Sequence, residues 1–114
     1  MPYLKIQSNQ AVEESKQASM LSKASTLVAT ELGKPESYVM VNLEPTRPMF
    51  FAGSDDPAAY HELKSIGLSD SQTKPLSAAL CQLIHENLNI PQNRIYVEFA
   101  DAHRSMWGWN GSTF

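Results

Sequence analysis

Hydrophobic and polar residues alternate in several short runs of this chain. Residues 3–7, 38–44 and 94–100 each place every second side chain on the same side. This period of two is typical of β-strands that pack one face on a protein core. Residues 49–52 form a shorter run of the same kind, and the weaker pattern of residues 58–66 fits a strand or a helix. The alternation therefore predicts a sheet of about four strands.

A first helix is predicted between the first two alternating runs. Its hydrophobic residues recur at helical spacing from Met20 to Leu32, after a polar start near residues 8–14. Gly33 should end this helix, because glycine adopts the left-handed conformation of a helix cap and Pro35 cannot continue a helix.

A second helix is predicted before the last alternating run. Its apolar stripe extends from Leu76 to Leu88. Proline is favourable only in the first turn of a helix, so Pro75 predicts a start between residues 71 and 73. Pro91 should prevent this helix from continuing toward the strand that follows.

The order of these elements predicts the fold class. Strand, helix, strand occurs twice, which implies two βαβ units whose helices pack on one face of the sheet. We expect an α/β (α+β) two-layer sandwich with a mixed sheet of about four strands and two antiparallel helices, formed by residues 1–114 as a single domain. The alternation of Tyr38 and Met40 with Val39 and Val41 also predicts apolar side chains on both sheet faces. Other subunits would then cover the second face.

Composition and charge restrict the classes of partner. Hydrophobic residues make up 42% of the chain, charged residues 18%, and the formal net charge is −3. The Lys and Arg residues are scattered, so we expect no nucleic-acid binding. No segment has the roughly 18 apolar residues of a membrane span, and the first residues lack the layout of a signal peptide. We therefore expect a cytoplasmic protein without membrane contact, although export without a signal peptide is compatible with this sequence.

Few residues offer metal or redox chemistry. Cys81 is the only cysteine, so an intrachain disulfide is impossible, and its place in the second helical stripe predicts a buried structural thiol. His61, His85 and His103 have no spacing that would gather them with carboxylates or cysteines around an ion. We predict no metal site.

Pro2 is the first candidate for chemistry. Removal of Met1 would turn its nitrogen into a free secondary amine, and α-amino groups titrate near ~7.7–8.0. A hydrophobic pocket or a nearby cation would lower this pKa, so that the neutral amine could act as a general base. If Met1 is retained, the Pro2 nitrogen is an amide and has no basic lone pair. A small second residue also simply permits the removal of Met1, so Pro2 alone does not decide between the two interpretations.

Several short motifs occur in a specific order along the chain. They are Pro2 after Met1, Gly33-Lys34-Pro35 followed by Tyr38, Phe51-Ala52-Gly53-Ser54 with Pro57, Ser65-Ile66-Gly67, Asn93-Arg94-Ile95-Tyr96, and Gly108-Trp109-Asn110 with Ser112-Thr113-Phe114. Through these motifs the chain resembles, over essentially its whole length, the macrophage migration inhibitory factor (MIF) family of the tautomerase superfamily.

This resemblance implies a homotrimer with a pocket at each subunit interface. It also implies cofactor-independent keto–enol tautomerisation of small aromatic 2-keto acids such as phenylpyruvate and hydroxyphenylpyruvate, or of dopachrome-like substrates. Pro2 would be the general base, Lys34 would bind the carboxylate and lower the pKa of Pro2, and the backbone N–H of Ile66 would contact the substrate. Tyr96 would reach the pocket from the neighbouring subunit. The remaining pocket walls would be aromatic: Tyr3, Tyr38, Trp109 and Phe114.

The chain departs from this family pattern at several positions. Glu98 stands where animal members carry an asparagine that donates a hydrogen bond to the substrate. An ionised carboxylate cannot donate, would repel an acidic substrate and would favour protonated Pro2. We therefore predict a weaker phenylpyruvate tautomerase than the animal proteins. Trp107 replaces a smaller residue at the pocket rim and should narrow it. The CxxC of the animal proteins aligns with residues 58–61, so a thiol–disulfide oxidoreductase activity does not transfer.

Two alternative functions stay open on the sequence. Animal relatives act as secreted cytokines, so one alternative is a signalling or binding protein whose pocket is vestigial. The other is a different proline-dependent reaction of the superfamily, such as dehalogenation or decarboxylation of a small acid. Those reactions need an additional acid or arginine in the pocket, and Glu98 is the only candidate.

Overall fold

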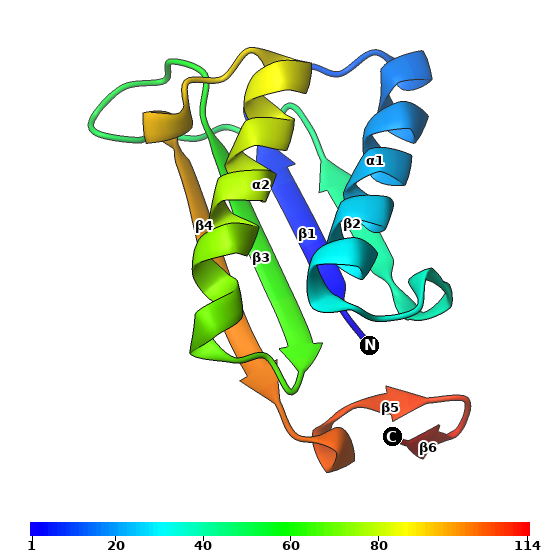
Figure 1. The fold of residues 1–114 in the computed structure, drawn as a ribbon. Coiled ribbons are helices and arrows are strands. Elements are labelled where there is room, and N and C mark those ends of the chain that lie inside the picture. The colour runs from blue at the N-terminus through cyan, green and yellow to red at the C-terminus, as the bar shows by residue number, and fades with distance from the viewer.

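A computed structural model describes residues 1–114 and shows two layers, a sheet and a pair of helices (Figure 1). The sheet has the strand order β2-β1-β3-β4. Its strands are β1 (Tyr3–Ser8), β2 (Met40–Glu44), β3 (Ala59–Ile66) and β4 (Ile95–Ala102). The helices α1 (Glu14–Leu32) and α2 (Asp70–Leu88) cover one face of this sheet. The predicted α+β sandwich is confirmed.

The pairing of the strands shows how the two halves are joined. β1 pairs in parallel with β2, and β3 pairs in parallel with β4, so each half is a βαβ unit with its helix as the crossover. The central pair, β1 with β3, is antiparallel. The sheet is therefore mixed, as the order of elements predicted.

Two sequence predictions for the strands need correction. Tyr38 does not belong to β2, because it lies in a 3-10 helix that precedes the strand. Residues 49–52 do not form a strand, and only an isolated bridge joins Phe51 to Ser54. The backbone turns sharply between these two residues, with positive φ at Ala52 and Gly53, and such a turn leaves no length for a ladder. The ambiguous segment 58–66 is resolved as the central strand β3.

Short elements connect and extend the main ones. They are the 3-10 helices η1 (Glu36–Tyr38), η2 (Gln92–Arg94) and η3 (Arg104–Met106), and the strands β5 (Gly108–Trp109) and β6 (Ser112–Thr113). β5 and β6 pair with each other in a small antiparallel sheet near the carboxyl terminus. This hairpin was not predicted, although the sequence Asn110-Gly111 signals it: both residues have positive φ, as a type I′ turn requires.

The helix ends follow local backbone chemistry. α1 ends at Gly33, whose φ is 62° and whose N–H donates to the carbonyl of Thr30 at 3.2 Å, as predicted. α2 starts at Asp70, earlier than predicted. The N–H of Ser69 donates to the Gln72 side chain at 3.0 Å, and this capping interaction determines the start. Pro75 lies inside the helix, and Ser71, whose carbonyl loses its N–H partner, is an exposed residue.

Neither helix combines the length and the apolar character that crossing a bilayer requires. Their apolar faces are instead buried against all four strands of the sheet. Fourteen buried residues form this core: Leu4, Ile6, Met20, Ala24, Val28, Leu32, Ala59, Leu63, Leu76, Leu80, Leu83, Ile84, Ile90 and Ile95. His61, which projects from β3 on the same side, is also fully buried.

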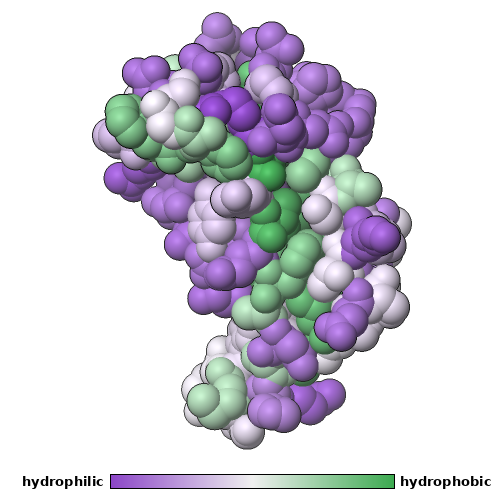
Figure 2. Space-filling view, turned by 90° about the vertical axis from the view of Figure 1, so that its left-hand side faces the viewer, coloured by the Kyte–Doolittle hydropathy of each residue, from purple (hydrophilic) through white to green (hydrophobic).

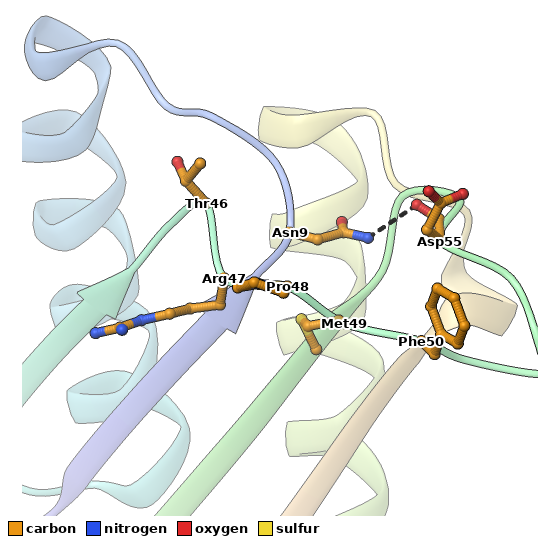
Figure 3. Close-up of a pocket in the computed structure, with 7 residues that line it drawn as sticks. All are labelled: Asn9, Thr46, Arg47, Pro48, Met49, Phe50 and Asp55. Carbon is orange, nitrogen blue, oxygen red and sulfur yellow. Dashed lines mark hydrogen bonds between the residues drawn. The ribbon is translucent and has the colours of Figure 1, made fainter.

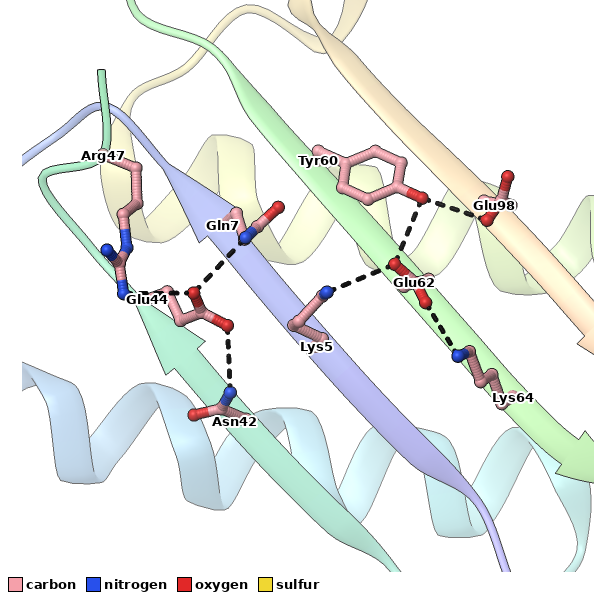
Figure 4. A network of polar contacts seen from close by, with 9 residues as sticks. All are labelled: Lys5, Gln7, Asn42, Glu44, Arg47, Tyr60, Glu62, Lys64 and Glu98. Atoms are coloured by element: carbon pink, nitrogen blue, oxygen red, sulfur yellow. Dashed lines mark hydrogen bonds and ion pairs between the residues drawn. The ribbon is translucent and has the colours of Figure 1, made fainter. Parts of the chain in front are cut away.

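The sheet face opposite the helices is polar in its middle, whereas Met40 and Tyr96 at its two ends are exposed apolar side chains, so the prediction of apolar residues on both faces holds only in part. Figure 4 shows this face with the helices behind it. Glu62 of β3 is central, with Lys5 at 3.3 Å and Lys64 at 3.0 Å. Nearer the β2 edge, Glu44 accepts from Gln7 at 3.3 Å and pairs with Arg47 at 3.2 Å. The middle of this face therefore needs no hydrophobic cover, and only its ends offer apolar side chains to other subunits.

The β4 edge has a different surface. β4 is the last strand of the sheet and has no neighbour on its outer side. Figure 2 looks at the molecule from this side and shows hydrophobic residues along the middle of the edge, with hydrophilic residues around them. Tyr96, at the start of β4, is 66% exposed. An unpaired strand edge with apolar neighbours is a surface to which another chain can add.

Candidate active site

A pocket of about 670 Å³ lies at the end of the sheet where β1 begins, and we call it the amino-terminal pocket. Its lining is predominantly hydrophobic, as in most small-molecule sites. The residues that line it are Met1, Pro2, Tyr3, Ser37, Tyr38, Val39, Met40, Lys64, Met106, Trp107, Gly108, Trp109 and Phe114. The structure thus brings together Pro2 and five of the six predicted aromatic residues, all except Tyr96.

The carboxyl-terminal hairpin builds the aromatic side of this pocket. The rings of Trp109 and Phe114 stack with centroids 5.4 Å apart and an interplanar angle of 14°. Tyr38 meets both rings edge-on, at 5.5 Å and 5.7 Å. The N–H of Phe114 donates to the carbonyl of Trp107 at 3.2 Å, which holds the chain end in place. The hairpin therefore presents flat apolar surfaces next to the amino terminus (Figure 1).

Pro2 lines the pocket just before β1 begins. It is fully buried, and its carbonyl accepts a hydrogen bond from the N–H of Met40 at 3.0 Å. In this structure the terminal amine belongs to Met1. Burial, and then the positive charge of Lys34, lower the pKa of this amine below its usual value. The surroundings at this end of β1 therefore favour a neutral, basic nitrogen.

Lys34 lies beside the amino terminus and is not part of the pocket lining. It follows the cap of α1, and its Nζ donates to the backbone carbonyl of Ile66 at 2.6 Å. Ile66, at the end of β3, is buried and is likewise outside the lining. The structure thus pairs these two predicted residues with each other. Lys34 acts on the terminal amine through its positive charge.

Tyr96 and Glu98 lie away from the amino-terminal pocket of their own chain. In the sheet register Tyr96 stands opposite Tyr60, and Tyr60 opposite Gln7 at the far end of β1. The ring of Tyr96 packs on Phe51 with centroids 4.7 Å apart. At about 3.3 Å per residue, the four positions between Tyr3 and Gln7 separate the two ends by roughly 13 Å. Within one chain, these two predicted residues therefore do not join Pro2.

Glu98 has a partner on the polar sheet face. The hydroxyl of Tyr60 lies 3.1 Å from a carboxylate oxygen of Glu98 and 3.3 Å from one of Glu62 (Figure 4). Partial burial and these two neighbouring carboxylates raise the pKa of Tyr60 to about 12. Tyr60 therefore remains a hydrogen-bond donor at neutral pH.

Several pocket residues were missed by the sequence predictions, and Lys64 is the most important. It stands opposite Tyr3 in the antiparallel pairing of β1 with β3. Only the alternation of Tyr60, Glu62 and Lys64 along one face of β3 hinted at its direction, and that segment was ambiguous. Met40 and Met106 were also missed, and both are largely exposed at the pocket rim.

Other candidate chemical groups lie outside the pocket. Nowhere in the structure do three or more His, Cys, Asp or Glu side chains gather in a way that could hold a metal ion. Cys81 is only partly buried, less than predicted, and burial raises the pKa of its thiol, which keeps it protonated. The ring of His61 has no hydrogen-bond partner on either nitrogen. Burial lowers the pKa of His61 to about 4.

A second cavity, of about 570 Å³, lies at the opposite end of the sheet (Figure 3). Asn9, Arg47, Phe50 and Asp55 are among its lining residues. The Asn9 side chain points across it and donates to the backbone carbonyl of Asp55 at 3.2 Å. None of the predicted site residues lies here, and Asp55 is the only carboxylate in its lining. The amino-terminal pocket is therefore the candidate active site.

The fold and this pocket define a class. The protein is a two-layer α+β protein of two βαβ units in which the residues at the start of the first strand form the floor of an aromatic pocket. This combination of fold and site is the one that the MIF-like motifs of the sequence implied.

Comparisons with known proteins establish the family. The profile of the family "Macrophage migration inhibitory factor (MIF)" matches residues 1–114. A macrophage migration inhibitory factor homolog of Brugia malayi is 44% identical over 115 aligned positions, which span 100% of this chain and 99% of that protein. Macrophage migration inhibitory factor of Xenopus tropicalis is 41% identical over 96 positions, 83% of this chain and 84% of the relative. The chain belongs to the macrophage migration inhibitory factor family of the tautomerase superfamily.

Solved structures agree with this assignment. The crystal structure of a macrophage migration inhibitory factor homologue from Prochlorococcus marinus superposes with a TM-score of 0.93, at 43% identity and with 98% of each chain covered. Macrophage migration inhibitory factor of Toxoplasma gondii gives a TM-score of 0.93 at 37% identity, covering 98% of this chain and 99% of that one. The fold and the family are therefore shared, and the tautomerase type of function fits both.

Proposed function

We propose that this protein is a cofactor-independent keto–enol tautomerase of phenylpyruvate-type aromatic 2-keto acids, with Pro2 as the general base after removal of Met1. The observation that carries the proposal is the position of Pro2. It is buried at the floor of an aromatic pocket, and the surroundings lower the pKa of the chain's terminal amine. A base that removes a weakly acidic proton from carbon has to be unprotonated at the working pH, and this environment favours that form.

The proposed reaction needs only a proton transfer. The Pro2 nitrogen removes a proton from the carbon next to the substrate carbonyl, a carbon–carbon double bond forms, and the proton is returned to the carbonyl oxygen to give the enol. The reverse sequence gives the keto acid. The stacked rings of Trp109 and Phe114 would orient the aromatic ring of the substrate.

The proposal includes a homotrimer. Tyr96 and Glu98 are far from the Pro2 of their own chain, so they would enter a pocket only from a second copy. The unpaired β4 edge carries both residues and has the hydrophobic surface that such contact needs. The molecular mass in solution tests this part of the proposal, and a monomer would contradict it.

The test of the activity compares three forms of the protein in a phenylpyruvate enolisation assay. They are the wild type, whose loss of Met1 is verified by mass spectrometry, a Pro2→Gly variant, and a variant with one alanine inserted between Met1 and Pro2. The insertion makes the Pro2 nitrogen an amide whether or not Met1 is removed. We expect activity in the wild type and a loss of at least about 100-fold in both variants, as for removal of a general base. An inactive wild type without Met1 would favour the binding-protein alternative.

A further inference from the structure

We propose that Met106 is an oxidation site that controls ligand binding in the amino-terminal pocket. Oxidation of its thioether by a peroxide gives the sulfoxide and weakens the binding of aromatic ligands, and reduction of the sulfoxide restores it. The inference rests on the proposed function, since it concerns the same pocket and the same class of aromatic ligand. It adds a reversible modification to that pocket.

Met106 is highly exposed for a methionine. It lines the pocket and is 78% exposed, whereas methionine is among the residue types that are most often buried. Met40 lines the same pocket and is 66% exposed. Met49 is half-buried at the second cavity, and Met20 is buried in the core. Once Met1 is removed, Met106 is therefore the methionine that a dissolved oxidant reaches most easily.

The backbone around Met106 is anchored. Met106 ends η3, and its N–H donates to the carbonyl of His103 at 2.9 Å. The next residue is Trp107, whose carbonyl accepts from the N–H of Phe114 at 3.2 Å. Trp107 and Phe114 line the pocket together with Met106. Met106 is therefore part of the aromatic wall of the pocket, and a change in its side chain alters the surface that a ligand contacts.

The thioether and the sulfoxide present different surfaces to an aromatic ligand. The thioether is apolar and polarisable, and it makes favourable contacts with aromatic rings. The sulfoxide carries a polar S–O group, and removing this group from water against an apolar ring without a hydrogen bond costs free energy. Because the pocket lining is predominantly hydrophobic, oxidation of Met106 favours the unliganded pocket.

The modification is the transfer of one oxygen atom. A lone pair of the Met106 sulfur attacks one oxygen of hydrogen peroxide, the O–O bond breaks, and hydroxide leaves. A proton then passes from the new S–OH group to the hydroxide, so the products are the sulfoxide and water. The sulfur is oxidised and the peroxide is reduced. Methionine sulfoxide reductases reverse the change with a dithiol, which becomes a disulfide, and one enzyme acts on each sulfoxide epimer.

Cys81 is a poor competitor for the oxidant. The thiolate is the form of cysteine that reacts with peroxides. Cys81 is only partly exposed, and burial raises the pKa of its thiol, so the protonated form dominates at neutral pH. Cys81 also lies outside the pocket lining. We therefore assign the effect on binding to Met106.

The experiment compares the protein without Met1 before and after treatment with hydrogen peroxide. Phenylacetate, an aromatic carboxylate that cannot undergo the proposed reaction, is titrated while the fluorescence of the pocket tryptophans is recorded. Peptide mass spectrometry follows the oxidation of each methionine. We expect Met106 to be oxidised first and Kd for phenylacetate to rise on the order of three- to tenfold, the range expected for lost sulfur–aromatic contacts. Treatment with both sulfoxide reductases should restore the original Kd.

Four variants localise the effect. Met106→Leu keeps an apolar side chain that peroxide does not oxidise, so peroxide treatment should change its Kd by less than about twofold. Met106→Gln has a polar side chain of similar length and should imitate the oxidised form without treatment. Met49→Leu is the matched control at the second cavity, and it should lose affinity on treatment as the wild type does. Met40→Leu should also lose most of this affinity.

Different results would overturn the proposal in different ways. A reduced protein that does not bind phenylacetate, or an oxidised protein with an unchanged Kd, would contradict it. If Met106→Leu lost affinity as the wild type does, or if Met40→Leu were protected instead, the assignment to Met106 would be wrong. If oxidation of Met106 weakens binding and the reduced wild type does not enolise phenylpyruvate, the proposed function fails and the oxidation site stands.

Discussion

The hydroxyl of Tyr60 lies 3.1 Å from the carboxylate of Glu98, across the β3–β4 pair. Because the pKa of Tyr60 is raised to about 12, this hydroxyl donates to Glu98 throughout the neutral range. The family resemblance puts Glu98 where animal members carry an asparagine, so we expect the pair to replace an amide that can donate with a carboxylate that accepts from its own chain. In the proposed trimer, this carboxylate would face the pocket of the neighbouring subunit.

Replacing Glu98 should therefore improve the proposed reaction. Glu98→Asn removes the negative charge and adds a donor, and we expect kcat/KM for phenylpyruvate to rise on the order of three- to tenfold. Tyr60→Phe leaves the carboxylate without its donor and should lower kcat/KM. Steady-state kinetics of both variants provide the test. An unchanged or lower kcat/KM for Glu98→Asn would show that the electrostatic explanation is wrong.

The charge of Lys34 should control the pH dependence of the reaction. Its positive charge, after burial, lowers the pKa of the terminal amine, so Lys34→Met should raise that pKa. The acid limb of the pH profile of kcat/KM then moves to higher pH, because the amine loses its proton only at a higher pH. Lys34→Arg keeps the charge and should leave the limb in place. If Lys34→Met left the acid limb in place, the proposed effect of Lys34 on the amine would be refuted.

Buried His61 should make the protein less stable in weak acid. Its pKa is lowered from 6.5 to about 4 in the folded chain by burial, so the unfolded chain binds a proton that the folded chain does not. The contribution to stability is complete above pH 6.5 and is lost as the pH falls from 6.5 toward 4. A shift of this size corresponds to about 3 kcal/mol. Urea unfolding at several pH values measures the loss.

The variant His61→Leu isolates this effect. Leucine has a similar volume and no titrating group, so the free energy of unfolding of the variant should depend less on pH between 6.5 and 4. Neighbouring carboxylates titrate equally in both proteins and cancel in the comparison. Parallel curves for wild type and variant would show that His61 is not the source of the acid sensitivity.

Arg94 should stabilise the loop before β3. Its guanidinium donates to the carbonyls of Pro57 at 2.9 Å, Phe51 at 3.0 Å and Asp56 at 3.0 Å, and it lies 5.2 Å from the centre of the Phe51 ring. Arg94→Met leaves these carbonyls without partners and should lower the free energy of unfolding by about 2–3 kcal/mol. Chemical denaturation measures this change.

Two further variants define what Arg94 contributes. Arg94→Lys should recover only a small part of the stability, because one ammonium group does not match the spacing of several carbonyls. Arg47→Met is the control, since Arg47 is 59% exposed and its single ion pair with Glu44 should contribute less than about 1 kcal/mol. Equal losses for Arg94→Met and Arg47→Met would contradict the proposed role of the loop contacts.

Local features were the part of the fold that could be predicted. Gly33 ends α1 as expected, because its left-handed conformation is a property of the residue itself. The predicted start of α2 was too late, because it relied on Pro75 lying in the first turn. The capping interaction between Ser69 and Gln72 starts the helix at Asp70 instead. Residues 58–66 could not be assigned, because a strand at the centre of a sheet is stabilised by partners that are remote in sequence.

In the candidate site, too, local motifs could be predicted, whereas residues placed by strand pairing could not. Pro2 and the aromatic residues were identified from the motifs, and the pocket brings them together. Lys64 was missed because only its pairing with Tyr3 places it there. The polar middle of the open sheet face was also missed, since Lys5, Glu62 and Glu98 form one network only when three strands lie side by side.

The sequence by itself determined the family, the two βαβ units and the nitrogen that could act as a base, because these depend on residue order, hydrophobic period and backbone preferences. Only the tertiary structure decided that Lys34 is held by Ile66, that Lys64 is the charged side chain of the pocket, and that Tyr96 lies at the other end of the sheet. The physical reason is that strand register and the direction of side chains arise from pairing between distant segments.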